Sequence, residues 1–201
     1  MHTPMIMTRL RVSAELDWTV RSYLASVRAR WSADALERRL ERALGAGVKE
    51  VAVFLSSSET HNKMNINKTI ADTLSVFEEI VPPAREAGVT VRAYLSTVWG
   101  CPYEGPVDAQ KALGIAQRLL ELGCYQVSIA DTIGVGTPRQ TSEIVKRFLG
   151  ALPPERFALH MHDTRGTALA NVLVALELGV RDFDSSVGGV GGCPYAPGAA
   201  G

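Results

Sequence analysis

The strongest constraint on the fold is a regular alternation of strand-like and helix-like segments. A β-branched or apolar run leads into a polar loop and then into a helical pattern that ends at a glycine. Strands are expected at residues 51–55, 89–97, 125–130, 157–162 and 180–186. Helices are expected at residues 69–87, 107–122, 138–149 and 164–178. This alternation predicts βα units and a parallel sheet, hence the α/β class.

The connecting loops differ on the two sides of each expected strand. Those that follow strands are long and polar, such as the segments that begin at Asp131 and Asp163, whereas those that precede strands are short. This asymmetry is typical of a (β/α) barrel or a doubly wound sheet with its site at the carboxyl ends of the strands. The first strand is not followed by a Gly-x-Gly-x-x-Gly pattern, which disfavours a dinucleotide site.

The first thirty residues show no sustained period of two or 3.6, although Trp18, Tyr23 and Trp31 suggest some burial. From Ser32 a helix is expected, which ends near Gly45 or Gly47. We therefore divide the chain into an unplaced segment, residues 1–30, and one domain over residues 31–201.

Composition excludes several function classes. Lys plus Arg and Asp plus Glu number 21 each, so net charge gives no case for nucleic acid or an anionic membrane. No apolar run has the length of a membrane span, and the N-terminus lacks the apolar core of a signal peptide. Three cysteines in 201 residues do not suggest a disulfide framework, so we expect a reducing cytoplasm.

The sequence His160-Met161-His162 is the strongest chemical feature. Side chains alternate along a strand, so the two histidines share one face and can bind one metal ion. The other two histidines, His2 and His61, lack this spacing and are expected at the surface.

Residues 186–201, SVGGVGGCPYAPGAAG, form a glycine-rich loop around one thiol. Cys193 is stiffened by Pro194, so the loop could carry a proton donor to a substrate or could be an ordinary turn. Asp131 and Thr132 end the third strand, where the aspartate is either a turn residue or a carboxylate at the barrel mouth. Tyr103 and Glu104 lie in a loop shaped by Pro102, and either could be a turn residue only.

These motifs resemble the 3-hydroxy-3-methylglutaryl-CoA lyase family. The resemblance rests on VKEVAVFLSSSETHNKMNIN, GCPYEG, DTIGVGTP, HMHDTRGTALANVLVAL and the cysteine loop, in the family's order from about Ala46 to Gly201. It implies a TIM (β/α)₈ barrel with Mg²⁺ or Mn²⁺ at its mouth. It also implies cleavage of 3-hydroxy-3-methylglutaryl-CoA to acetoacetate and acetyl-CoA, as in leucine degradation and ketone-body metabolism.

The resemblance also implies roles for particular residues. His160 and His162 would bind the metal, Cys193 would be the catalytic thiol, and Asp131 would be an active-site carboxylate. Four further positions match the family near the acyl-CoA substrate: Tyr103, Ser128, Thr132 and Asn65.

Two departures from the family lead us to expect an incomplete barrel that lacks its first one or two strands and its C-terminal part. The family's opening Arg-Asp-Gly, which supplies an arginine and a metal-binding aspartate, is absent; the only Arg-Asp, at residues 181–182, begins the last strand. The family's metal-binding asparagine would fall just beyond Gly201.

An open barrel leaves unpaired strand edges and exposes interior residues, beginning with Val51, Val53 and Val91. We therefore expect a homo-oligomer, unless residues 1–30 cover the gap. Two other functions remain open: a related enzyme that condenses acetyl-CoA with keto acids, which the GGCPY loop disfavours, and a non-catalytic interaction module.

Overall fold

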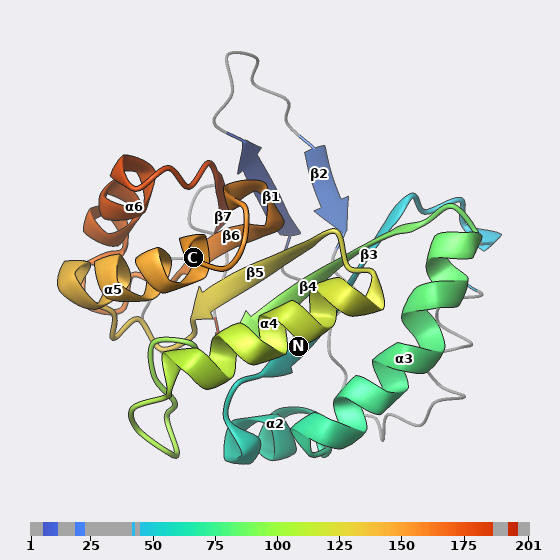
Figure 1. The fold of residues 1–201 in the computed structure, drawn as a ribbon, viewed down its shortest axis with the longest axis horizontal. Coiled ribbons are helices and arrows are strands. Elements are labelled where there is room, and N and C mark those ends of the chain that lie inside the picture. Colours follow the sequence, from blue (N-terminus) through green and yellow to red (C-terminus); the bar gives the residue numbers. More distant parts are fainter. Residues whose placement is uncertain (1–5, 12–18, 23–41, 43–44, 187–192, 197–201) are drawn as a thin grey trace.

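The protein is described by a computed structural model that covers residues 6–11, 19–22, 42, 45–186 and 193–196. Its centre is one seven-stranded sheet with the strand order β2-β1-β7-β6-β5-β4-β3 (Figure 1). The strands from β3 to β7 run parallel, as the alternating pattern predicted. Their bounds are β3 Glu50–Ser56, β4 Thr90–Ser96, β5 Gln126–Asp131, β6 Phe157–Met161 and β7 Asp182–Ser186.

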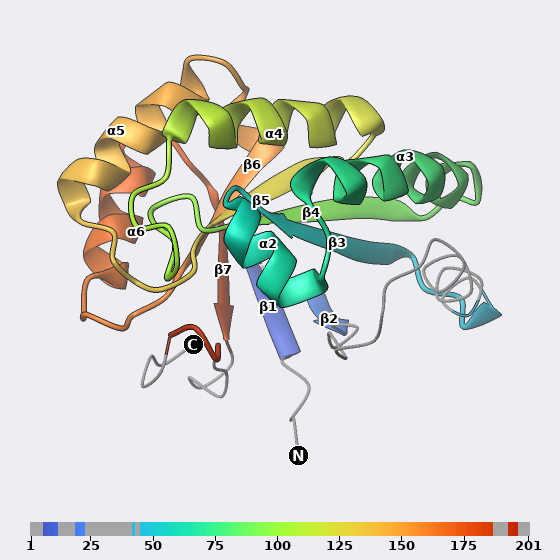
Figure 2. The ribbon, with the colours of Figure 1, turned by 90° about the horizontal axis from the view of Figure 1, so that it is seen from below.

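Helices α3 to α6 lie along one side of the curved sheet (Figure 2). The predicted helices are confirmed with ends that differ by a few residues at most. Their bounds are α3 Ile70–Glu86, α4 Ala109–Leu122, α5 Pro138–Leu149 and α6 Ala168–Glu177, and a short 3₁₀ helix, η1, spans Pro154–Arg156. In the part of the chain that the structure describes, no helix is both long and apolar enough to cross a membrane.

The start of α5 shows how local sequence fixes these ends. The Thr137 side chain accepts a hydrogen bond from the backbone N–H of Gln140, and the Gln140 side chain accepts one from the Thr137 backbone. Pro138 then stands at the first helical position, where its missing N–H costs nothing.

Apart from the short helix η1, three elements were not predicted. Helix α2, Glu59–Ile66, occupies the polar stretch after β3. Strands β1, Ile6–Arg11, and β2, Thr19–Ser22, come from the first thirty residues. Strand β1 pairs antiparallel with β7 on one side and with β2 on the other. The helix predicted from Ser32 lies outside the described residues, except for its C-terminal end.

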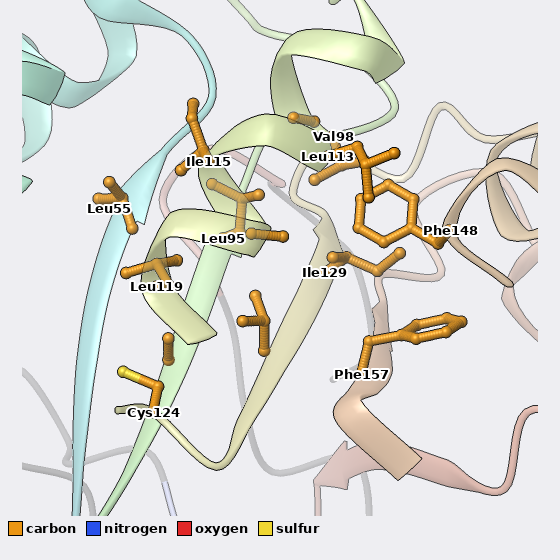
Figure 3. Close-up of a cluster of buried hydrophobic side chains, with 14 of the residues drawn as sticks. Leu55, Leu95, Val98, Leu113, Ile115, Leu119, Cys124, Ile129, Phe148 and Phe157 are labelled. Atoms are coloured by element: carbon orange, nitrogen blue, oxygen red, sulfur yellow. The ribbon is translucent and has the colours of Figure 1, made fainter. Parts of the chain in front are cut away.

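The hydrophobic core lies between the parallel strands and the helices (Figure 3). Alternate strand residues such as Leu95, Ile129 and Phe157 point into it and are fully buried. Val53 and Val91 also belong to this core, so the expectation that they line an exposed barrel interior is wrong. The alternation of side chains places them on the helix-facing side of their strands.

The partial barrel therefore has two chemically different faces. One is apolar and covered by helices, and the other carries the polar side chains described below. The homo-oligomer stays a prediction.

Removing a core ring should test the helix–sheet contact. Phe148 of α5 is fully buried, and its ring centroid lies 5.6 Å from that of Phe157 on β6. We expect Phe148→Ala to lower the free energy of unfolding by about 3–5 kcal/mol, because it leaves a cavity between two layers. Chemical denaturation measures this loss.

Leu169 of α6 offers a matched control because it is 81% exposed. We expect Leu169→Ala to change the free energy of unfolding by less than about 0.5 kcal/mol. Equal losses in the two variants would contradict the proposed core.

Candidate functional site

The two predicted metal ligands come together at the carboxyl end of β6. The Nε2 atoms of His160 and His162 lie 3.0 Å apart. His162 is 8% exposed, and the side chain of His160 is 13% exposed. Two imidazole nitrogens at right angles around a metal at about 2.1 Å would be about 3 Å apart, so the spacing fits adjacent ligand positions.

The opposite ring nitrogens face polar partners. His162 Nδ1 lies 2.7 Å from the carbonyl oxygen of Thr132, which can only accept, so Nδ1 carries the proton. His160 Nδ1 lies 3.5 Å from the Oδ2 atom of Asp184. Metal-binding histidines usually face a carbonyl or a carboxylate in this way, which leaves Nε2 as the ligand atom. The residues present therefore fit a metal.

The electrostatics favour the metal-binding form of His162. Burial, followed by the neighbouring His160, lowers the pKa of His162 to about 4. The ring is therefore neutral near pH 7, as ligation requires. Within the described residues, no group of three or more His, Cys, Asp or Glu side chains could hold a metal, so the histidine pair offers two candidate ligands.

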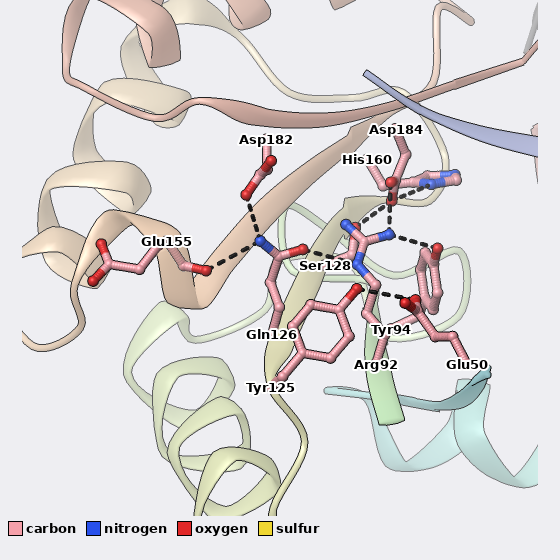
Figure 4. Close-up of polar contacts among 10 residues, drawn as sticks. All are labelled: Glu50, Arg92, Tyr94, Tyr125, Gln126, Ser128, Glu155, His160, Asp182 and Asp184. Carbon is pink, nitrogen blue, oxygen red and sulfur yellow. Dashed lines mark hydrogen bonds and ion pairs between the residues drawn. The ribbon is translucent and has the colours of Figure 1, made fainter. Parts of the chain in front are cut away.

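A buried polar network lies beside His160 (Figure 4). Arg92 of β4 donates to Asp184 of β7 at 2.7 Å and to the Tyr94 hydroxyl at 2.6 Å. Ser128 of β5 donates to the second Asp184 oxygen at 2.5 Å. Gln126 accepts from Arg92 at 2.9 Å. The network therefore connects three strands behind the metal-ligand pair.

Charge pairing determines the state of Asp184. Burial alone would raise the pKa of this carboxyl, but Arg92, with smaller contributions from His160 and Ser128, holds it well below its usual value. Burial also raises the pKa of Tyr94 to about 12. At neutral pH, Asp184 is therefore a carboxylate facing His160, and Tyr94 keeps its proton.

Asp131 is placed as a turn aspartate. It is fully buried, and its side chain lies on the helix-facing side of β5, as alternation from Ile129 requires. Its oxygens accept hydrogen bonds from the backbone of Val135 at 3.0 Å and of Gly136 at 2.7 Å. Burial raises its pKa, although these amides oppose the shift. Its catalytic role stays a prediction.

The predicted substrate-binding residues occupy different positions. Ser128 is fully buried and donates to Asp184, and the Thr132 hydroxyl accepts from the backbone of Thr97 at 2.7 Å. Tyr103 is 46% exposed on the loop after β4, and Asn65 is half-buried on α2. Thr132 thus contacts His162 directly through its carbonyl oxygen, and Ser128 is linked to His160 through Asp184.

The predicted thiol lies in a described turn, residues 193–196. The Cys193 carbonyl accepts a hydrogen bond from the Ala196 backbone at 2.9 Å, and the cysteine is half-buried. Burial raises the pKa of the thiol, so it stays protonated at neutral pH. The rest of the glycine-rich loop, residues 187–192 and 197–201, lies outside the described residues.

Sequence reasoning missed the network and misplaced His61. His61 is 1% exposed rather than at the surface, because α2 buries it against β3. A detectable signal existed for the network: polar residues recur at every second position of a strand, at Arg92 and Tyr94 in β4 and at Asp182 and Asp184 in β7.

Comparison with known proteins settles the family. The HMGL-like family matches residues 21–201. The chain belongs to the HMGL-like family. This family is generally metal-dependent, in agreement with the paired histidines.

Among curated proteins, this HMGL-like chain is 47% identical over 165 residues to a hydroxymethylglutaryl-CoA lyase of Bacillus subtilis, covering 82% of the chain and 55% of the relative. It is 50% identical over 161 residues to a 3-hydroxy-3-isohexenylglutaryl-CoA/hydroxy-methylglutaryl-CoA lyase of Pseudomonas aeruginosa, covering 80% and 54%. The chain thus spans about half the length of these relatives.

Solved structures agree with the fold. A crystal structure of hydroxymethylglutaryl-CoA lyase from Pseudomonas aeruginosa has a TM-score of 0.78 at 49% identity, over 82% of this chain and 55% of that one. The Bacillus subtilis HMG-CoA lyase structure gives a TM-score of 0.79, over 81% and 55%. The chain is therefore a partial TIM barrel.

The Arg92–Asp184 ion pair gives a test of the network. Both side chains are almost fully buried. We expect Arg92→Met to lower the free energy of unfolding by about 3–5 kcal/mol, because it leaves the Asp184 charge buried and unpaired. The double variant Arg92→Met/Asp184→Leu should recover part of the loss, since neither charge remains. Urea denaturation at pH 7 measures both.

The pair Arg118–Glu78 is a matched control, because its atoms are 2.6 Å apart but its side chains are 45% and 47% exposed. We expect Arg118→Met to cost less than about 1 kcal/mol. A double variant no more stable than Arg92→Met would argue against an uncompensated charge as the cause.

Proposed function

We propose that this chain contributes to a metal-dependent lyase that cleaves 3-hydroxy-3-methylglutaryl-CoA to acetoacetate and acetyl-CoA. The observation that carries the proposal is the pair of imidazole nitrogens 3.0 Å apart, each ring backed by an oxygen partner. The names of the similar lyases supply the substrate class, an acyl-CoA.

The proposed cofactor is Mg²⁺ or Mn²⁺, held by His160 and His162. Bound at this position, the cation would supply polarisation of the substrate oxygens. Thr132 and Asp184 would keep the two rings in register for it, through the Nδ1 contacts already described.

The proposed cleavage is a reversed Claisen-type reaction. A base removes the proton of the tertiary hydroxyl, the adjacent carbon–carbon bond breaks, and its electron pair becomes the enolate of acetyl-CoA. Cys193 is the proposed donor that protonates this enolate, because its raised pKa keeps the thiol protonated. Asp131 is the proposed catalytic carboxylate.

The substrate contacts are proposed from the family motifs. Tyr103 and Asn65 are the accessible candidates, since both keep exposed surface. Ser128 and Thr132 would have to exchange their present hydrogen bonds for contacts with the substrate.

Cys193→Ser is the direct test of the proposed reaction. With 3-hydroxy-3-methylglutaryl-CoA and added Mg²⁺ or Mn²⁺, we expect the variant to lose on the order of 10²–10⁴-fold in kcat, the scale of a positioned acid. Acetyl-CoA release measures the rate.

Cys124→Ser is the matched control because Cys124 is buried in the core and burial raises its pKa to about 12. We expect a much smaller change in kcat. Full activity in Cys193→Ser would return this cysteine to a structural role, and no turnover by the unsubstituted chain would favour the non-catalytic alternative.

Metal preference provides a separate prediction. Two imidazoles bind Ni²⁺, Cu²⁺ or Zn²⁺ better than Mg²⁺, which prefers six oxygen ligands. Calorimetric titration of the chain without substrate should therefore show tighter binding of Ni²⁺ than of Mg²⁺, and His160→Ala should weaken Ni²⁺ binding. Tight Mg²⁺ binding would mean that further oxygen ligands complete the site.

A further inference from the structure

The tetrapeptide Gly-Cys-Pro-Tyr occurs twice in the chain, at residues 100–103 and 192–195. The first copy lies in a tight loop, where the Cys101 backbone exchanges two hydrogen bonds with Gly105, at 2.8 and 3.0 Å. The second copy turns at residues 193–196 through the Ala196 N–H to Cys193 carbonyl bond of 2.9 Å. Proline is favoured at the second position of a turn, and here each turn begins at the cysteine. The turn therefore fixes the position of each tyrosine relative to its cysteine.

The two tyrosines meet beside His61. The ring centroid of His61 lies 4.5 Å from that of Tyr195 and 6.3 Å from that of Tyr103. The two tyrosine rings are 6.1 Å apart and nearly perpendicular, at 78°. These are favourable distances for aromatic pairs. We call His61, Tyr103 and Tyr195 the ring cluster.

His61 is the fixed member of the ring cluster. It is 1% exposed on α2, and its Nδ1 atom lies 2.5 Å from the hydroxyl oxygen of Ser56 at the end of β3. Its other nitrogen, Nε2, is buried without a hydrogen-bond partner among the described residues. Burial of an unsatisfied nitrogen costs free energy. The favourable contacts of this ring are the tilted ones with Tyr195, at 56°, and with Tyr103, at 47°.

We propose that His61 is a positioning residue for Cys193. His61 packs against the Tyr195 ring and holds it in place. Because Tyr195 and Cys193 belong to the same turn, residues 193–196, this contact also fixes the position of the thiol. The exposed Tyr103, from the other Gly-Cys-Pro-Tyr turn, packs against the same two rings. The relevance of this positioning role to catalysis rests on the proposed function. The positioning role itself is independent of that function.

The reactivity of Cys193 reports its position without any substrate or metal. We expect His61→Ala to raise the rate of Cys193 alkylation by iodoacetamide about tenfold, the scale expected for the loss of one or two aromatic pairs. Peptide mass spectrometry separates Cys193 from the buried Cys101 and Cys124. His61→Phe keeps a flat ring and should restore the rate to within about twofold of the unsubstituted chain.

Met64→Ala is the matched control, since Met64 lies on the same helix and is 62% exposed. It should leave the alkylation rate unchanged. Tyr103→Ala provides a second route if His61→Ala does not fold, because Tyr103 is partly exposed, and it should also speed alkylation.

Two outcomes would overturn the proposal: folded His61→Ala and Tyr103→Ala chains that alkylate at the unsubstituted rate, or a His61→Phe chain as reactive as His61→Ala. If the unsubstituted chain shows no lyase activity while the alkylation rates change as expected, the result would count against the proposed reaction and not against the positioning role.

Discussion

The ion pair between Arg92 and Asp184 depends on the curvature of the sheet. Strands β4 and β7 are separated by β5 and β6. In a flat sheet, three strand spacings would hold their backbones about 14 Å apart. An Nη1–Oδ1 distance of 2.7 Å is reached because the strands curve around a common interior, and Gln126 and Ser128 fill the space between them. The buried ion pair therefore forms only because the sheet is curved as in a barrel.

The same carboxylate links the fold to the candidate metal site. One Asp184 oxygen accepts from Arg92, and the other accepts from Ser128 and faces His160 Nδ1. An unpaired carboxylate here would be expensive to bury. Arginine neutralises it and leaves it ionised, which is the state that orients a histidine for metal binding. Ser128 consequently has a supporting role in this structure, beside its proposed contact with substrate.

The sequence predicted the parallel βα units because apolar periodicity and glycine stops are local signals. It did not predict α2, whose residues 59–66 are mostly polar. That helix is held by its ends: Ser58 caps it, and Glu104, from another loop, accepts from the Thr60 N–H at 2.6 Å. The two residues of this contact are 44 positions apart in the chain, so no local sequence pattern predicts it. The burial of His61 depends on this helix packing against β3, so it was missed with the helix.

Asp131 was singled out from its place at the end of β5, and in this structure its carboxylate binds the backbone of the loop that follows. Its carboxylate holds the backbone of Val135 and Gly136, where a Cβ on Gly136 would lie 2.8 Å from Asp131 Oδ2 and 2.7 Å from Trp99 Cδ1. Only glycine allows that approach. The loop so held begins at Thr132, whose carbonyl fixes the tautomer of His162. Asp131, on the helix-facing side of β5, is thus linked to His162 through the loop backbone that it binds and the Thr132 carbonyl.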